Sequence, residues 1–410
     1  MASIDVPGVA APLNYRCNTK SMPSSLPLLP TAAAAVAFRF LRLRLSPPSH
    51  LPIPPPPLLS PSTKPISTTY LSSSSGGTMD GHRPSTLLLL AGKSPEENDL
   101  AQSLKSKSGT LKFGGEEQEE IKILLQSEMD SVTPPTFSSQ LYMDVLSTSR
   151  FGRLLIWSPR LPSTHDLVSQ NFSELPLGTV CIADVQFKGR GRAKNVWESP
   201  EGCLLFSFTL QMEDGHKLPL LQYVVSLAVT EAIKESCRAQ GSPQLDVRIK
   251  WPNDLYLDGL KVGGILCTST YRSKKFNVCA GIGLNLDNEK PTTCFNMVLQ
   301  KLSSGTHRLM REDILAAFFN NFENLFDIFL IQGFQALEEL YYKTWLHSGQ
   351  KVIIEEKHEG QSVEETAVIV QGLTSSGYLL ATDEDKKSYE LHPDGNSFDF
   401  FKGLVRRKLG

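Results

Sequence analysis

The sequence lacks several features that mark common functional classes. Its seven cysteines include no Cys-x-x-Cys pair and no His/Cys group at zinc-ligand spacing, which argues against a structural zinc module or a disulfide framework. No apolar run reaches the length needed to cross a bilayer, and a net charge of −2 gives no general positive field for nucleic acid. A phosphate-binding P-loop and a Ser/His/Asp nucleophile set are also missing. We therefore expect no membrane, nucleic-acid or resident metal partner.

Acidic residues are scarce in residues 1–78, which hold six basic residues against one acid, Asp5. The segment is rich in Pro, Ser, Ala and Leu, a composition that does not bury a core. Acid-poor N-terminal segments with Arg and Ser are typical of organellar transit peptides, and an ordinary disordered tail is the alternative. We expect import into the chloroplast rather than the mitochondrion. A second start at Met79 would give a cytosolic form.

The length of 410 residues predicts about two domains with additional segments. Residues 79–150 form an N-terminal extension of unassigned role, with a short strand at 87–90 and a short helix at 117–127. The main body, 151–348, is expected to bind the ligands. Its hydrophobic periodicity predicts strands at 154–157, 179–186, 203–210, 247–250, 262–268 and 277–284, and helices at 222–240, 312–331 and 334–345.

The C-terminal part, residues 349–410, has a different pattern. Its β runs are short and are separated by Ser, Gly, Asp and Asn. Several short strands joined by tight turns predict a small SH3-like β-barrel. In the body, strands and helices do not alternate regularly. The sequence therefore predicts an α+β fold, in which a mixed sheet with helices is followed by the small barrel.

The segment Gly189-Arg190-Gly191-Arg192 is the first candidate for ligand binding, because it directly follows a predicted strand. Glycines let the backbone approach a ligand closely, and guanidinium groups bind carboxylate or phosphate through charge-assisted hydrogen bonds. The alternative for this tetrapeptide alone is a solvated Arg/Gly turn. It predicts an anion-binding loop only in combination with a second motif.

That second motif is Lys250-Trp251-Pro252-Asn253-Asp254, about sixty residues later. Pro252 restricts its own φ and favours an extended Trp251, which presents an amide and a carboxylate just beyond a strand end. Lys261 follows a turn and could neutralise a substrate carboxylate next to a nucleotide phosphate. Gly264 would let its strand pass close to a flat ligand. A plain β-turn and a solvated lysine are the alternatives.

Smaller candidates accompany these motifs. Ser163 and Thr164 offer hydroxyl groups at a predicted helix start, where simple N-capping is the alternative. Gln186 ends a strand and is either a ligand contact or a satisfied edge group. Trp197 either stacks on a purine or packs in the core. Asn285 either reaches a nucleotide or serves as a turn residue.

In this order and spacing, the motifs resemble those of the biotin protein ligase family, also called holocarboxylase synthetases, and the plant members most of all. The likeness covers residues 150–410. It implies a mixed sheet like that of class II aminoacyl-tRNA synthetases, followed by a small β-barrel. It also implies a ligase that forms AMP and diphosphate: biotin and MgATP give biotinyl-AMP, and biotin then passes to a lysine. The implied acceptors are the biotin carboxyl carrier domains of acetyl-CoA carboxylase and related carboxylases, and we expect a monomer.

The resemblance also implies residue roles. The catalytic set consists of Lys261, Arg192 and Asp254. The implied biotin site consists of Ser163, Thr164, His165, Gln186, Arg190, Gly191, Arg192, Lys261 and Gly264. The implied ATP site consists of Trp197, Asn253, Asp254 and Asn285. His165 stands where bacterial relatives often have Asn, and residues 193–196 are less basic than their bacterial counterpart.

Two other functions fit parts of the pattern. A lipoate-type ligase shares the fold and the chemistry, but lipoate has no ureido ring, so the Gly/Arg loop joined to residues 250–254 favours biotin. A biotin-sensing regulator would bind without turnover. No helix-turn-helix module precedes the body, which argues against a DNA-binding repressor.

Overall fold

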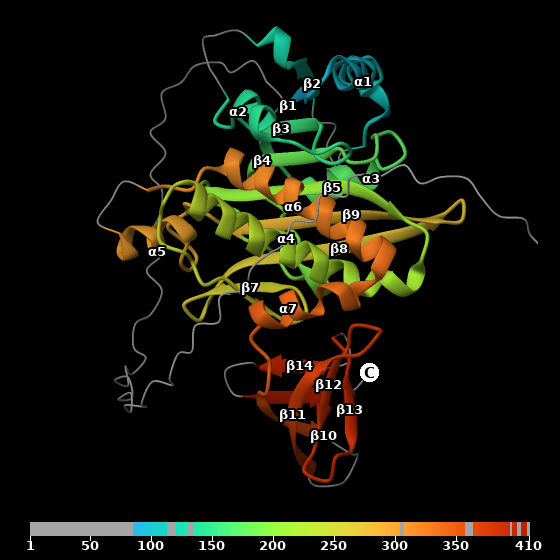
Figure 1. The fold of residues 1–410 in the computed structure, drawn as a ribbon. Helices are drawn as coiled ribbons and strands as arrows, with labels where there is room; N and C mark the ends of the chain where they lie inside the picture. The colour runs from blue at the N-terminus through green and yellow to red at the C-terminus, as the bar shows by residue number, and fades with distance from the viewer. Residues whose placement is uncertain are drawn as a thin grey trace, which may run out of the picture. The chain divides into compact units, whose positions relative to one another are not determined.

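The computed structural model describes residues 85–112, 120–129, 135–303, 307–356, 364–393, 396–399 and 403–407. The predicted transit segment and Met79 lie outside these residues. All described residues belong to one compact unit that begins at Gly77. They form a nine-stranded mixed sheet with helices and a separate six-stranded sheet (Figure 1). The predicted α+β class is confirmed.

The large sheet has the strand order β2-β1-β3-β4-β5-β9-β8-β7-β6. Its strands are β1 (Ser85–Gly92), β2 (Glu120–Leu125), β3 (Leu154–Leu161), β4 (Val180–Gln186), β5 (Cys203–Met212), β6 (Arg248–Lys250), β7 (Asp254–Leu257), β8 (Leu260–Arg272) and β9 (Lys275–Asn285). The α-helices are α1 (Pro95–Ser106), α2 (Ser139–Val145), α3 (Thr164–Gln170), α4 (Leu218–Ala239), α5 (Phe295–Leu302), α6 (Arg311–Gln332) and α7 (Glu338–Thr344). The strands and helices predicted for the body are present, most of them a few residues longer than predicted.

The N-terminal part of the described chain extends this sheet. β1 pairs parallel with β2 and antiparallel with β3. The helix predicted at 117–127 is wrong where the chain is described, because residues 120–125 form β2. Ile121, Ile123 and Leu125 alternate along β2 and pack into the core under α1, and this two-residue period is that of a strand. The domain boundary expected at 151 therefore falls inside a continuous sheet.

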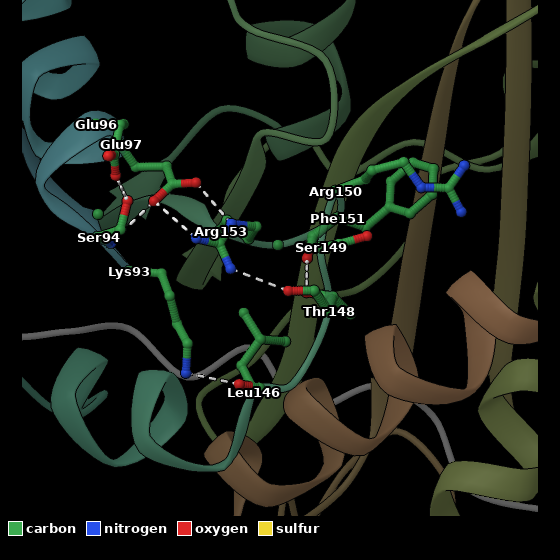
Figure 2. A network of polar contacts seen from close by, with 12 residues as sticks. Lys93, Ser94, Glu96, Glu97, Leu146, Thr148, Ser149, Arg150, Phe151 and Arg153 are labelled. Atoms are coloured by element: carbon green, nitrogen blue, oxygen red, sulfur yellow. Dashed lines mark hydrogen bonds and ion pairs between the residues drawn. The ribbon is translucent and has the colours of Figure 1, made fainter.

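Polar contacts also join this N-terminal part to the segment that leads into β3 (Figure 2). Arg153 Nε donates to Glu97 Oε1 at 2.6 Å, and Arg153 Nη1 donates to the Thr148 carbonyl at 3.0 Å. Lys93 Nζ donates to the Leu146 carbonyl at 2.6 Å. Lys93 directly follows β1, and Glu97 lies in the first turn of α1. The apolar core and these hydrogen bonds together hold the β1–α1–β2 unit on the sheet.

The main core lies between the large sheet and the helices α4 and α6, which run together over one face (Figure 1). Phe318, Phe322 and Phe329 of α6 are at most 1% exposed, and the Phe322 ring lies 5.0 Å from the ring of Phe208 on β5, centroid to centroid. By length and composition α6 could cross a membrane, yet 56% of its most apolar stretch is buried inside the molecule. The phenylalanines of α6 therefore serve core packing.

The second sheet, here called the C-terminal module, confirms the predicted small β unit. Its strand order is β13-β12-β11-β10-β15-β14, and only the β10–β15 pair is parallel among its described pairs. Val352, Ile354, Val368 and Val370 alternate along two strands and face its core. The strands are β10 (Lys351–Glu356), β11 (Glu364–Leu373), β12 (Leu379–Thr382), β13 (Ser388–Leu391), β14 (Asn396–Asp399) and β15 (Leu404–Arg407).

Candidate active site

The predicted ligand-binding motifs meet around a cavity of about 400 Å³, a size suited to a small organic ligand. It is walled by the start of α3, the end of β4 with the loop that follows, the β6–β7 turn, β8 and β9. The predicted residues that line it are Ser163, Thr164, His165, Gln186, Arg190, Gly191, Arg192, Trp197, Asn253, Asp254, Lys261 and Gly264. Further lining residues, which were assigned no role in the predicted site, include Ser207, Gly281, Gly283 and Pro393.

One wall presents uncharged hydrogen-bonding groups. Ser163 caps α3, and the next residue, Thr164, donates from both its N–H (2.7 Å) and its hydroxyl (3.0 Å) to Gln186 Oε1. The Thr164 hydroxyl also lies 2.9 Å from Ser207 Oγ, and Gln186 Nε2 donates to Ser199 Oγ at 3.2 Å. These groups hold each other in fixed orientations, so the wall suits a neutral ligand that carries both donors and acceptors.

His165 is buried behind this wall. Its Nε2 lies 2.9 Å from Thr268 Oγ1, and its Nδ1 lies 3.2 Å from Cys279 Sγ. Burial, assisted by the charge of Arg190, lowers the pKa of His165 to about 4. The ring is therefore neutral at physiological pH, and both of its nitrogens contact protein groups. This arrangement suits a packing and orienting role rather than that of a general base.

The Gly/Arg loop folds over the cavity as a small hairpin. Arg190 and Val196 form an isolated antiparallel bridge, and Gly191 N–H donates to the Asn195 carbonyl at 2.8 Å. Arg190 Nε lies 2.9 Å from Asp166 Oδ2. Arg192 Nη1 donates to Asn253 Oδ1 at 3.2 Å. Both guanidinium groups are thus held at the cavity by polar partners, and an anionic ligand would compete for them.

The β6–β7 turn places an amide and a carboxylate at the cavity, as predicted. The Trp251–Pro252 peptide bond is cis, a feature that the sequence reasoning did not anticipate. Asn253 Nδ2 donates to the Ile265 carbonyl of β8 at 2.6 Å. Asp254 Oδ1 lies 2.7 Å from Lys261 Nζ, and this ion pair is partly exposed to solvent. A single carboxylate therefore orients the lysine within the cavity.

Two glycine strands form the floor, and Trp197 lies against them. A Cβ atom at Gly283 would come within 2.5 Å of Trp197 Nε1, and one at Gly264 would come within 3.3 Å of Cζ3. Lys261 Nζ lies 5.4 Å from the centroid of the Trp197 ring. The indole N–H is buried and has no hydrogen-bond partner among the described residues. Close passage of a flat group over Gly264 was predicted.

Asn285 is the predicted site residue that the structure does not bring to the cavity. It is 3% exposed, and its Nδ2 donates to Thr292 Oγ1 at 3.0 Å and to the Thr293 carbonyl at 3.2 Å. The side chain therefore braces the segment that follows β9. A direct contact with a nucleotide would require these bonds to open.

The charges at the cavity determine what it can do chemically. Arg190, Arg192 and Lys261 contribute three cations, and Asp254 is the single carboxylate among its described lining residues. Cations in a partly enclosed site offset the repulsion between two anions that must approach each other. In the described part of the chain, no group of three His, Cys, Asp or Glu side chains is arranged to hold a metal ion. The site therefore suits the joining of a carboxylate to a phosphate.

Comparison with known proteins places both sheets in one family. Residues 157–285 match the biotin/lipoate A/B protein ligase family, and residues 347–403 match the biotin protein ligase C-terminal domain. The chain is 61% identical over 325 residues to biotin–protein ligase 1, chloroplastic, of Arabidopsis thaliana, covering 78% of this chain and 88% of that protein. It is 62% identical to Arabidopsis biotin–protein ligase 2, covering 78% and 98%.

More distant proteins also match this chain. Human biotin–protein ligase is 32% identical over 76% of this chain and 44% of its own length. A solved structure of the Aquifex aeolicus biotin protein ligase in complex with biotin and ATP is 25% identical, with a TM-score of 0.47 over 58% of this chain and 94% of that one. The likeness to the two Arabidopsis proteins extends over most of their length and of this chain, and it includes the cavity. The chain therefore belongs to the biotin protein ligase family.

Proposed function

We propose that this chain is an ATP-dependent biotin–protein ligase that works in two half-reactions at the cavity. Biotin and MgATP first give biotinyl-AMP and diphosphate. A lysine of a carrier protein then takes the biotinyl group, and AMP leaves. The observation that carries the proposal is the convergence of Arg190, Arg192 and Lys261 on one small cavity, in a chain of this family.

In the first half-reaction, a carboxylate oxygen of biotin attacks the α-phosphorus of ATP, and the bond from that phosphorus to the bridging oxygen breaks. The main obstacle is repulsion, because the carboxylate and the triphosphate are both anionic. Lys261 binds the carboxylate in this proposal, while Arg190 and Arg192 cover the phosphate. Fixed cations are already oriented, so they stabilise the crowded charge without reorganising at the moment of reaction. Magnesium enters as part of the MgATP substrate.

The neutral wall gives the preference for biotin. The ureido ring carries two N–H donors and one carbonyl acceptor, which match the hydroxyl and amide groups of Ser163, Thr164 and Gln186. Lipoate offers no such ring, so it would gain none of these hydrogen bonds and should bind less tightly than biotin. His165 completes this end of the cavity. Adenine is proposed to lie near Trp197, with Asn253 near the phosphate.

In the second half-reaction, the neutral ε-amine of the acceptor lysine attacks the acyl carbon, and the bond between that carbon and the phosphate oxygen breaks. The amine loses a proton, and Asp254 is the proposed acceptor. Because Asp254 Oδ1 lies 2.7 Å from Lys261 Nζ, the same carboxylate can orient the lysine in the first step and assist the incoming amine in the second. The hairpin of Arg190 and Arg192 keeps water from the anhydride.

The proposed acceptors are the biotin carboxyl carrier domains of acetyl-CoA carboxylase and related carboxylases, and the protein is proposed to act as a monomer. Residues 1–78 are proposed to direct import into the chloroplast. Their composition supports this, as does the chloroplastic name of one Arabidopsis relative. A start at Met79 would leave a cytosolic form. Tracking tagged protein in fractionated cells tests both forms, and a single species in the cytosol would contradict the import proposal.

The decisive experiment combines the purified protein with biotin and MgATP and measures biotin-dependent exchange of pyrophosphate into ATP. A carrier domain is then added, and the mass of its acceptor lysine is read. We expect exchange, formation of biotinyl-AMP and one biotin on the carrier. Competition by free lipoate separates the lipoate-type ligase from the proposed function. A protein that binds biotin but never forms the acyl-AMP would instead be a sensor.

A further inference from the structure

A buried polar network beside the cavity plays no part in the chemistry above. Trp251 stands two residues before Asn253 and is 3% exposed. Its backbone N–H donates to His347 Nε2 at 2.9 Å, and its indole N–H donates to Tyr223 OH at 2.9 Å and to the Gly377 carbonyl at 3.2 Å. His347 lies in the segment that leads into the C-terminal module, and Gly377 lies between β11 and β12. Trp251 is thus held at both its N–H groups by partners from outside the β6–β7 turn.

The hydrogen bonds of His347 determine which of its ring nitrogens carries the proton. A peptide N–H can only donate, so Nε2 must accept, and the ring proton then sits on Nδ1. Nδ1 lies 3.0 Å from Gln350 Oε1, so the Nδ1–H group donates a hydrogen bond to this amide oxygen. The side chain is fully buried, and burial is the main cause that lowers its pKa to about 4. At physiological pH, His347 is a neutral acceptor locked onto the peptide N–H of Trp251.

Gly377 provides the second attachment of Trp251 to the C-terminal module, because its carbonyl accepts from the Trp251 indole. Its φ of +80° favours glycine, and its N–H closes a turn onto the Thr374 carbonyl at 2.9 Å. A Cβ atom there would come within 3.1 Å of Tyr223 Cε2, so this turn packs directly on α4. The hydroxyl of Tyr223 donates to the Gly377 carbonyl while accepting from the indole of Trp251. The C-terminal module is therefore bonded to Trp251 both directly and through Tyr223.

Trp251 leads straight into the two polar residues of the turn. Asn253 contacts Arg192 of the hairpin, and Asp254 contacts Lys261. Ligands would compete for Arg192 and Lys261, while the bond from Asn253 Nδ2 to the Ile265 carbonyl of β8 would remain. The far side is fixed by the network just described, which a ligand in the cavity would leave intact.

We propose that His347 is a positioning residue through which the C-terminal module holds the Asn253–Asp254 turn in the geometry that biotin activation requires. This inference rests on the proposed function and adds a role for the module within the first half-reaction. Thr164 and Gln186, which face the biotin ring in that proposal, lie on α3 and β4. Loss of the His347 acceptor should therefore lower kcat while largely sparing biotin affinity.

The test compares His347→Leu with His347→Gln in the full chain. Leucine removes the acceptor, whereas the Gln carbonyl can still accept from the Trp251 N–H. We expect His347→Leu to lower kcat of biotin-dependent pyrophosphate exchange roughly ten- to a hundred-fold, the scale of a small misplacement of reacting groups. The Kd for biotin should change by less than about threefold. His347→Gln should recover most of kcat. His216 is exposed and receives the same two substitutions as a control.

Three results would overturn the inference while leaving the ligase function intact: normal kcat in a folded His347→Leu protein, an equal loss of kcat in His347→Gln, or a loss confined to biotin affinity. If His347→Leu does not fold, His347→Met takes its place, because methionine adapts to a buried site and its thioether is only a weak acceptor. A kcat within about twofold of the wild type would then overturn the proposal. Wild-type protein without exchange activity would instead refute the proposed function itself.

Discussion

At the scale of single residues, Lys261 carries the sharpest prediction. Its ammonium is the cation proposed to bind the biotin carboxylate, and it is held in place by Asp254 at 2.7 Å. Lys261→Ala should lower biotin-dependent pyrophosphate exchange roughly a hundredfold or more, the usual cost of removing one oriented charge from a reacting site. The unfolding temperature should change little, because the pair is partly exposed. Lys275→Ala, at a surface pair with Glu213, is the control, and near-normal exchange in Lys261→Ala would refute the assignment.

Gly283 gives a second prediction for a single residue. Gly283→Ala would place a Cβ atom 2.5 Å from Trp197 Nε1, so the indole must move. If Trp197 packs against adenine as proposed, we expect the KM for MgATP to rise by about tenfold, which corresponds to roughly 1.4 kcal/mol of lost binding free energy. Gly109→Ala serves as a matched control, because a Cβ atom there would meet nothing within 4 Å. An unchanged KM for MgATP would place adenine elsewhere.

The sequence predicts the identity of the charged residues better than their partners. Gly189 to Arg192 and residues 250–254 stand out because few other functions need those residue types in that order. The hydrogen bond between Arg192 and Asn253 joins positions far apart in the chain, so no local sequence pattern predicts it. Asn285 shows the same limit, because its residue type suits a ligand contact, yet its side chain bonds to the Thr292 hydroxyl and the Thr293 carbonyl.

At the scale of elements, the Gly/Arg hairpin is proposed to retain the reactive intermediate. Arg192 attaches it to the β6–β7 turn through Asn253 at 3.2 Å. Arg192→Gly removes that attachment and one cation, so biotinyl-AMP should escape and label lysines on unrelated proteins. Incubation with serum albumin, followed by detection of attached biotin, measures this. Labelling that stays restricted to the carrier domain would show that the hairpin does not retain the intermediate, and Lys188→Gly, in the same segment but outside the cavity lining, is the control.

Element prediction succeeded where hydrophobic periodicity was strong. The Phe-rich stretch at 312–331 became α6, since its rings repeat at helical spacing over many turns. It failed at 117–127, where Ile121 and Ile123 follow a two-residue period over too short a stretch to exclude a helix. The helix α1 was missed, although Ser94 and Pro95 form a start signal, because its outer face is polar and its apolar stripe is narrow.

At the scale of the whole molecule, the N-terminal and C-terminal parts both attach to the ligand-binding body. β1 pairs with β2 and with β3, so the two N-terminal strands extend the sheet. On the other side, Gly377 and His347 bond to Trp251. Such attachments between distant segments depend on individual hydrogen bonds, which composition and spacing do not reveal. They make the stability of the body depend on groups that do not line the cavity.

The two buried histidines make that dependence measurable through pH. Burial lowers the pKa of His165 and of His347 to about 4, against an ordinary value near 6.5. Below pH 6.5 the unfolded chain therefore binds protons that the folded chain does not, and stability falls as pH drops from 6.5 towards 4. Each histidine contributes a slope of about 1.4 kcal/mol per pH unit within that window.

His347→Gln removes one of the two histidines that take up a proton on unfolding. Between pH 6.5 and 5, the free energy of unfolding should therefore fall less steeply, by up to about 1.4 kcal/mol per pH unit. Urea unfolding at a series of pH values measures it, with the same substitution at the exposed His216 as the control. If His347→Gln and wild type lose stability in parallel, His347 is protonated in the folded protein. In that case it cannot accept the Trp251 N–H, since an imidazolium has only donors.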